Sequence, residues 1–298
     1  MPSNNPVFRH SDGFNKPNAN AYGNAVYGGN GGSYAGYGDP STWSVGSAGS
    51  AGATGSSYAG TTTASRPMTV DSVVQKTGIA VGVVALAAII TWLVTPDVAN
   101  SNGFDNDGIS QIYAAATIGA LGAFVLSMVN SFKRVISPAL VVLFCAFEGV
   151  ALGALSKVFD AAFGSGVVSG AVLGTFAAFA GTLAAYKYLN IKIGNKFRTF
   201  VTAAVFGMIG LSVVSLVFSL FGADLGLFGF GPIGALTAIA GLALGIFMLI
   251  MDFDFVEQGI ANHLDERESW RAAFAMTVSL VWIYTNLLRL LAILSNND

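Results

Sequence analysis

Three carboxylates stand close together in this sequence, directly after a long uncharged run, Leu225–Met251. They are Asp252, Asp254 and Glu257, in a chain that has only 16 Asp and Glu in all. Residues three apart share a helix face, so Asp254 and Glu257 point the same way, while Asp252 lies about 200° from Asp254. A carboxylate at the rim of a membrane helix faces either water or the interior of a bundle, where it marks an ion or proton path. Both interpretations stay open: a solvated helix end or an ion- and proton-sensing site.

A further acidic residue, Glu148, lies near the middle of the apolar stretch 135–156. A charged, unpaired carboxylate at the centre of a bilayer costs about 2.5–3.5 kcal/mol on insertion scales. We therefore expect Glu148 to face the inside of a helix bundle. There it serves either as a structural hydrogen bond between helices or as part of the sensing site.

The last apolar stretch carries polar residues at helical spacing: Ser279, Trp282, Asn286 and Arg289. This spacing puts one polar stripe along an otherwise apolar helix, and such a stripe should face other helices rather than lipid. The helix that bears it is a good candidate for the centre of a bundle. Arg289, near the end of the helix, could instead extend to the membrane surface.

Catalytic and metal-binding patterns are weak. The two histidines, His10 in the N-terminal segment and His263 in a loop, do not form a pair at metal-ligand spacing. The segment 229–234 matches G-x-G-x-x-G, but no strand precedes it and Pro232 opens an apolar helix, which argues against a nucleotide site. The segment 104–108 looks like part of a calcium loop but lacks the bidentate Glu. We expect no enzyme activity, no metal site and no cofactor.

Composition identifies a membrane protein. Of 298 residues, 53% are hydrophobic and only 10% are charged, and the mean hydropathy is +0.64; soluble domains are about one quarter charged. The net charge of −2 argues against nucleic acid as a partner. The single cysteine, Cys145, excludes an internal disulfide. No cleavable signal peptide is recognisable at the N-terminus, so the first span should act as the insertion signal.

Two domains are expected. Residues 1–67 are rich in Gly, Ser and Tyr with almost no Leu, Ile or Val, which predicts a disordered tail. Residues 68–298 form a membrane domain, and its first helix should begin at Thr69 as N-cap with Asp71 in the first turn. An all-α fold with seven transmembrane helices follows from runs of about 20 or more residues with at most one charge: 77–96, 108–132, 135–156, 161–186, 199–223, 225–251 and 272–294.

Basic residues predict the orientation. With the tail inside the cell, the inside segments hold 12 of the 14 Lys and Arg, the outside segments hold only Lys157, and Arg289 lies within the last span. The protein is therefore expected in the cell membrane as a multi-pass protein. Its N-terminus is predicted to be cytoplasmic and its C-terminus extracytoplasmic. The carboxylates at 252–257 then lie at the inner end of the sixth span.

Four blocks of sequence are similar to the Bax inhibitor (TMBIM, YccA-like) superfamily, and most of all to its actinobacterial branch. They are Met68–Thr77, Met251–Gln258, Trp270–Phe274 and Leu287–Leu294, and the similarity is expected to span roughly 68–294. The resemblance implies six helices around a central seventh. It also implies a pH-sensitive calcium leak, in which a carboxylate late in the sixth helix pairs with one in the seventh.

The resemblance puts the sixth-helix carboxylate at Asp252, and Asp254 is the second candidate for this position. The seventh-helix position falls near Asn286 or Ser279, and neither residue is an acid. This departure means that Glu148, Asp254 or Glu257 would have to supply a second carboxylate. We expect a pH-sensitive calcium or proton leak in the lipid bilayer. The alternative is a non-conducting regulator that binds other membrane proteins, such as a quality-control protease.

Overall fold

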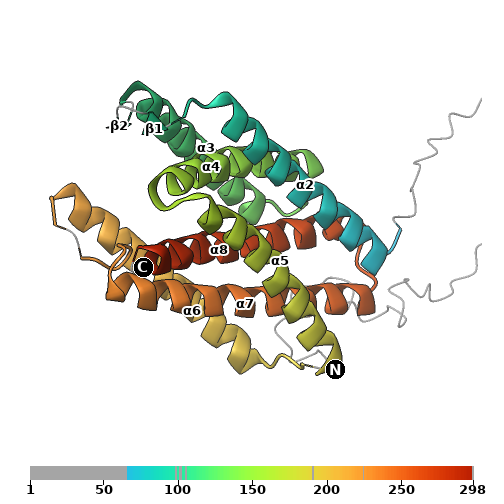
Figure 1. The fold of residues 1–298 in the computed structure, drawn as a ribbon. Helices are drawn as coiled ribbons and strands as arrows, with labels where there is room; N and C mark the ends of the chain where they lie inside the picture. The colour runs from blue at the N-terminus through green and yellow to red at the C-terminus, as the bar shows by residue number, and fades with distance from the viewer. Residues whose placement is uncertain are drawn as a thin grey trace, which may run out of the picture. The chain divides into compact units, whose positions relative to one another are not determined.

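Long helices make up nearly all of the chain that can be described (Figure 1). The computed structural model describes residues 66–97, 99–100, 103–104, 106–189, 191–223 and 225–296. Within this part, seven helices are long and apolar enough to cross a membrane. They are α2 (Val70–Val94), α3 (Asn106–Phe132), α4 (Pro138–Phe163), α5 (Ser165–Tyr188), α6 (Asn195–Leu220), α7 (Pro232–Ala261) and α8 (Glu268–Ser295). The predicted all-α, seven-span fold is confirmed. The predicted disordered tail falls almost wholly outside the described residues.

A short hairpin joins the first two helices. Strand β1 (Ala99–Asn100) pairs antiparallel with β2 (Gly103–Phe104), so the chain turns within a few residues before α3 begins. This hairpin covers part of the segment that resembles a calcium loop.

The start of α2 is fixed by local hydrogen bonds, as the sequence predicts. Thr69 is the N-cap: its hydroxyl accepts from the backbone N–H of Ser72 at 3.1 Å, and the Ser72 hydroxyl accepts from the Thr69 N–H at 3.1 Å. This reciprocal pair satisfies two helix-terminal donors. Just before the cap, the chain pairs with the α7–α8 loop, because the Met68 N–H donates to the Leu264 carbonyl at 2.7 Å.

Helix α7 begins seven residues later than its apolar run predicts. The run starts at Leu225, but residues 225–231 form a bent segment in which Gly226 has φ 66°, and the helix starts at Pro232. Proline suits a first helical turn because its fixed φ is helical and it needs no N–H partner. The helix then runs on through the carboxylates to Ala261. Its 30 residues span about 45 Å, more than the ~30 Å hydrocarbon core, so one end reaches the interface.

Helix α8 is the centre of the bundle, as predicted. It packs against α2, α4, α5 and α7, and Figure 1 shows it in red between the other helices. Apolar α8 side chains enter several parts of the core: Ala273 on the α2–α4 side, Met276 and Ile283 on the α7 side, and Leu288 near α5. A helix buried from several sides in this way sets the position of its neighbours.

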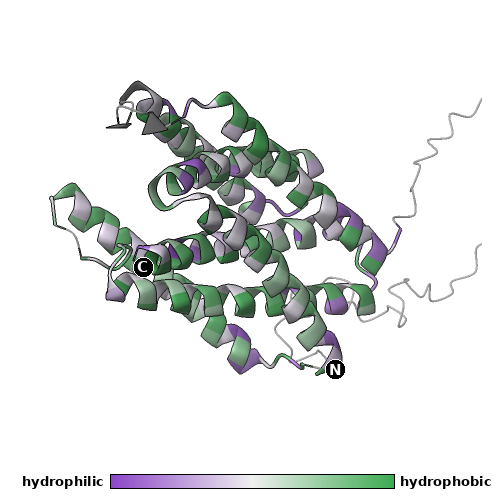
Figure 2. Cartoon of the chain, viewed as in Figure 1, coloured by the Kyte–Doolittle hydropathy of each residue, from purple (hydrophilic) through white to green (hydrophobic). Residues whose placement is uncertain are grey.

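Helices α2 and α4 approach closely because two glycines lie between them. A Cβ atom at Gly149 would collide with the Val84 carbonyl, and one at Gly153 would collide with the Ala88 carbonyl. Small residues four apart allow such backbone contact in lipid. Helix α6, in contrast, lies at the edge: among the described helices it packs mainly against α7, and Phe206 is 69% exposed. Figure 2 shows that hydrophilic residues gather towards the helix ends while the long middle sections are hydrophobic.

Candidate ion-sensing site

The carboxylate of Asp252 meets α8 at Ser279. The Ser279 hydroxyl donates to Asp252 Oδ2 at 2.5 Å. Ser279 is 1% exposed and Asp252 is half-buried, so the pair lies inside the α7–α8 interface. Of the two positions that the family resemblance left open for the second acid, Ser279 is therefore the one that faces Asp252.

Asn286 lies elsewhere along the same interface. Its amide donates to the Trp282 carbonyl at 2.8 Å, and its side chain lies against Gly241 on α7. Trp282 also contacts α7, since its indole N–H donates to the Gly241 carbonyl at 2.8 Å. Arg289 reaches the Thr237 hydroxyl at 3.0 Å. The predicted polar stripe of α8 thus faces α7 over most of its length.

Asp254 and Glu257 bind other helices. Asp254 is 8% exposed and forms an ion pair with Arg198 at the start of α6; it also accepts from the Gln258 amide at 2.7 Å. Glu257 is exposed and accepts from the Tyr186 hydroxyl on α5 at 2.5 Å. These two acids hold α5 and α6 to α7. Asp252 differs from Asp254, because no basic side chain pairs with it among the described residues.

Glu148 lies apart from this group. It is half-buried on α4 between Phe144, whose ring contacts Phe274 at 4.9 Å, and Ser156, whose hydroxyl is 2.6 Å from that of Tyr284. Residues four apart share a helix face, so Glu148 faces the side of α8 that packs on α4. Ser279 faces α7, so the body of α8 separates Glu148 from Asp252. The carboxylate of Glu148 has no hydrogen bond or ion pair within the described residues.

The sequence matches the family described as Bax inhibitor 1 like over residues 5–296. The chain belongs to this family. The match begins well before residue 68, the expected start of the similarity. It therefore includes most of the Gly- and Tyr-rich N-terminal segment. A comparison with curated proteins found no match.

Two residues of this Bax inhibitor 1-like protein that contact the acids, Arg198 and Tyr186, were not recognised as candidates from sequence. Arg198 is separated from Asp254 by 56 residues and Tyr186 from Glu257 by 71, so no local spacing could reveal either contact. Arg198 stood out only as one basic residue among several in a predicted inside segment. In the part of the chain that is described, no three His, Cys, Asp or Glu side chains lie close enough to hold a metal ion.

Proposed function

We propose that this membrane protein is a slow leak for calcium or protons, and that Asp252 makes the leak respond to pH. The observation that carries the proposal is the hydrogen bond of 2.5 Å between Ser279 and Asp252. It places an acid without a basic partner, within the described residues, between α7 and the central helix α8. An ionisable group inside a membrane bundle is a candidate for ion or proton transfer by default.

Protonation changes what this pair can do. An ionised Asp252 only accepts hydrogen bonds, which suits the donating hydroxyl of Ser279. A protonated Asp252 is neutral, so it attracts a cation less. It also carries an O–H group that can itself donate a hydrogen bond, which changes its hydrogen bonding with Ser279. The α7–α8 contact at this level is therefore sensitive to protons. Asp254 is less suited to the role because Arg198 already balances its charge.

The proposed orientation places Asp252 relative to the two sides of the membrane. We place the protein in the cell membrane with its N-terminus in the cytoplasm and its C-terminus outside, as the basic residues indicate. Several of these residues gather at one end of the bundle: Lys76 pairs with Glu266 at 3.1 Å, and Arg271 donates to the Arg134 carbonyl at 2.9 Å. Asp252 would then lie towards the cytoplasmic end.

Calcium and proton flux into proteoliposomes between about pH 5 and 8 would test the proposal. We expect a leak above that of empty vesicles in the unchanged protein, and loss of its pH response in Asp252→Asn. Ser279→Ala should shift the pH midpoint without removing the leak, because the acid remains. Asp71→Asn changes an exposed acid in the first turn of α2 and should match the unchanged protein. Folded protein without flux at any pH would end the proposal.

A second candidate, a non-conducting regulator of other membrane proteins, gains support from α6. This helix leaves large apolar side chains on the outside, including Phe200 (61% exposed) and Leu216 (61% exposed). Lipid can cover such a face, and so can a partner helix. Copurification of a defined membrane protein that is lost in Phe200→Ala and Leu216→Ala variants, together with absence of flux, would favour this second function.

A further inference from the structure

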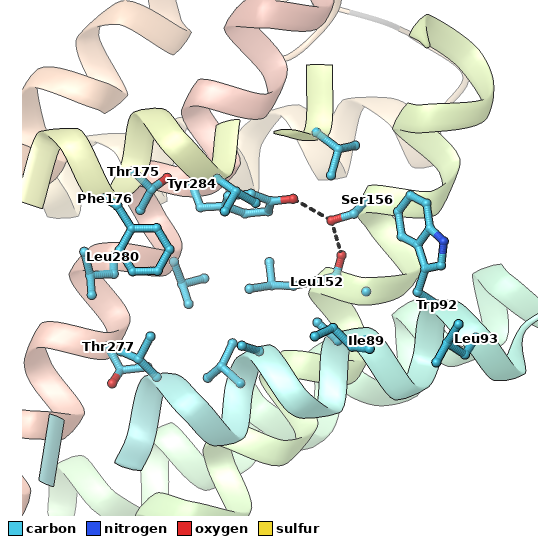
Figure 3. Close-up of a pocket in the computed structure, with 18 residues that line it drawn as sticks. Ile89, Trp92, Leu93, Leu152, Ser156, Thr175, Phe176, Thr277, Leu280 and Tyr284 are labelled. Carbon is cyan, nitrogen blue, oxygen red and sulfur yellow. Dashed lines mark hydrogen bonds between the residues drawn. The ribbon is translucent and has the colours of Figure 1, made fainter. Parts of the chain in front are cut away.

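A cavity of about 400 Å³ opens between α2 and α5, away from the acid pair (Figure 3). Helices α2 and α5 form its sides, and α4 and α8 form its floor. Its volume lies within the range of about 300–1,000 Å³ that is usual for small-molecule sites. The mouth is lined by side chains that are well exposed, such as Ile89 (56%) and Phe176 (55%), whereas Thr277 (1%) and Leu280 (9%) lie at the floor. The cavity therefore opens sideways, from the membrane-facing surface into the bundle.

The hydroxyl groups that line the cavity are already used. Ser156 donates to the Leu152 carbonyl at 2.6 Å, so the Tyr284 hydroxyl, 2.6 Å away, must donate to Ser156. Thr175 donates to the Ala171 carbonyl and Thr277 to the Ala273 carbonyl, both at 2.7 Å. No hydroxyl hydrogen among the described lining residues is left for a polar ligand or for water, which needs several polar partners. The cavity is therefore built for an apolar occupant.

The length of the cavity matches one leaflet of a bilayer. On α2 its lining extends from Val81 to Leu93, a rise of about 18 Å along a helix. Half of a hydrocarbon core is about 15 Å. Leu93 is one residue from the end of α2, and its neighbour Trp92 is of a type that prefers the membrane interface. Val81 and Thr277 lie deeper, towards the middle of their helices.

We propose that this cavity binds one acyl chain of a membrane phospholipid, which enters sideways between α2 and α5. The chain lies with its methyl end near Thr277 and its ester end near Trp92. The indole N–H of Trp92 is a donor at the interface end, where an ester or headgroup oxygen would be. In a bilayer, lipid acyl chains surround the mouth of the cavity, so the bound chain comes directly from the surrounding lipid and takes up a defined position. This site is independent of Asp252 and of ion flux.

Photolabelling tests the proposal in the unchanged protein. Proteoliposomes of phosphatidylethanolamine and phosphatidylglycerol would contain a phospholipid with a diazirine at its chain end. We expect label on Thr277 and Leu280, which lipid can reach only by entering the cavity, and none on Ile283. Ile283 is equally buried (0% exposed) on the same helix but does not line the cavity. Label confined to exposed residues such as Leu86 and Leu173 would overturn the proposal.

Native mass spectrometry of detergent-purified protein provides a second test. We expect one phospholipid to stay bound in the unchanged protein and in Leu86→Trp, and to be lost in Ala85→Trp. Ala85 and Leu86 are both exposed neighbours on α2, but only Ala85 lines the cavity. Equal retention in both variants, or a free fatty acid or other small molecule as the retained species, would contradict a phospholipid chain in this cavity.

Discussion

Lys157 on α4 donates a hydrogen bond to the carbonyl of Trp92, which lies in the last turn of α2, at 2.9 Å. It also donates to the Thr95 carbonyl at 2.5 Å and pairs with Asp97 at 3.2 Å, although Lys157 itself is only 7% exposed. Helix α2 has no basic residue in its own last turn. A cation from α4 therefore satisfies carbonyl groups at the negative end of the α2 dipole. This role explains why a basic residue occurs on the side that the charge pattern predicts to be outside.

Replacing Lys157 by Met should destabilise the protein. The change removes the donor from the carbonyl groups of Trp92 and Thr95, which are half-buried. Leaving a fully buried group unsatisfied costs about 1–3 kcal/mol, so we expect a lower melting temperature in detergent. Lys187→Met is the control, because Lys187 is exposed at the end of α5 and should have little effect. Equal melting temperatures for the two variants would show that the contacts of Lys157 contribute nothing.

Gly241→Ala should also destabilise, through the contact of α7 with Asn286. A Cβ atom at position 241 would collide with Asn286 Oδ1, and overpacking typically costs about 1–3 kcal/mol. Asn286→Ala in the same chain should restore part of the loss, measured by a double-mutant cycle of unfolding free energies. Gly207→Ala is the matched control. Nothing lies within 4 Å of its Cβ position, so replacing this helical glycine should stabilise by about 0.5–1 kcal/mol. Destabilisation at both positions would contradict the assigned contact.

Arg198→Met should loosen the start of α6. The change leaves Asp254 buried and without its cation. Breaking a fully buried pair costs about 3–5 kcal/mol, and we expect about 1–3 kcal/mol here because the Arg198 side chain is 39% exposed. Hydrogen exchange in residues 195–201 should rise, and adding Asp254→Asn should reverse part of the increase. Unchanged exchange in Arg198→Met would mean that packing alone, such as Phe197 on Phe247, holds α6.

Ser279→Asp should strengthen the pH response of the proposed leak. The new carboxylate would lie beside Asp252, and two carboxylates at that separation share a proton and titrate as a coupled pair. Flux between about pH 5 and 8 should then show a steeper or additional transition, while Asn286→Asp, on another part of the interface, should not. A transition that appears in Asn286→Asp and not in Ser279→Asp would assign the second position to Asn286.

The number of helices and the centre of the bundle could be predicted because each depends on a pattern within one segment. Uncharged runs define the spans, and the polar spacing on 279–289 identifies the helix that cannot face lipid. The start of α2 was also predictable, since Thr69 and Ser72 cap it through contacts three residues apart.

Features that depend on contacts between distant segments could not be predicted. Hydropathy does not distinguish the apolar bend at 225–231 from the helix that follows it, so the start of α7 was placed too early. The choice between Ser279 and Asn286 depends on how α8 is shifted along α7. The cavity arises only where four helices fail to fill the space between them, and no single segment encodes it.

The segment just before α2 is joined to the loop between α7 and α8 by two hydrogen bonds, on either side of the bridge between Pro67 and Asp265. The Met68 N–H donates to the Leu264 carbonyl and the Glu266 N–H donates to the Arg66 carbonyl, each at 2.7 Å. Force applied to the chain ahead of Arg66 would therefore act on α2 and on the α7–α8 hairpin at one point. These contacts tie the start of α2 to the loop that connects the two helices carrying Asp252 and Ser279.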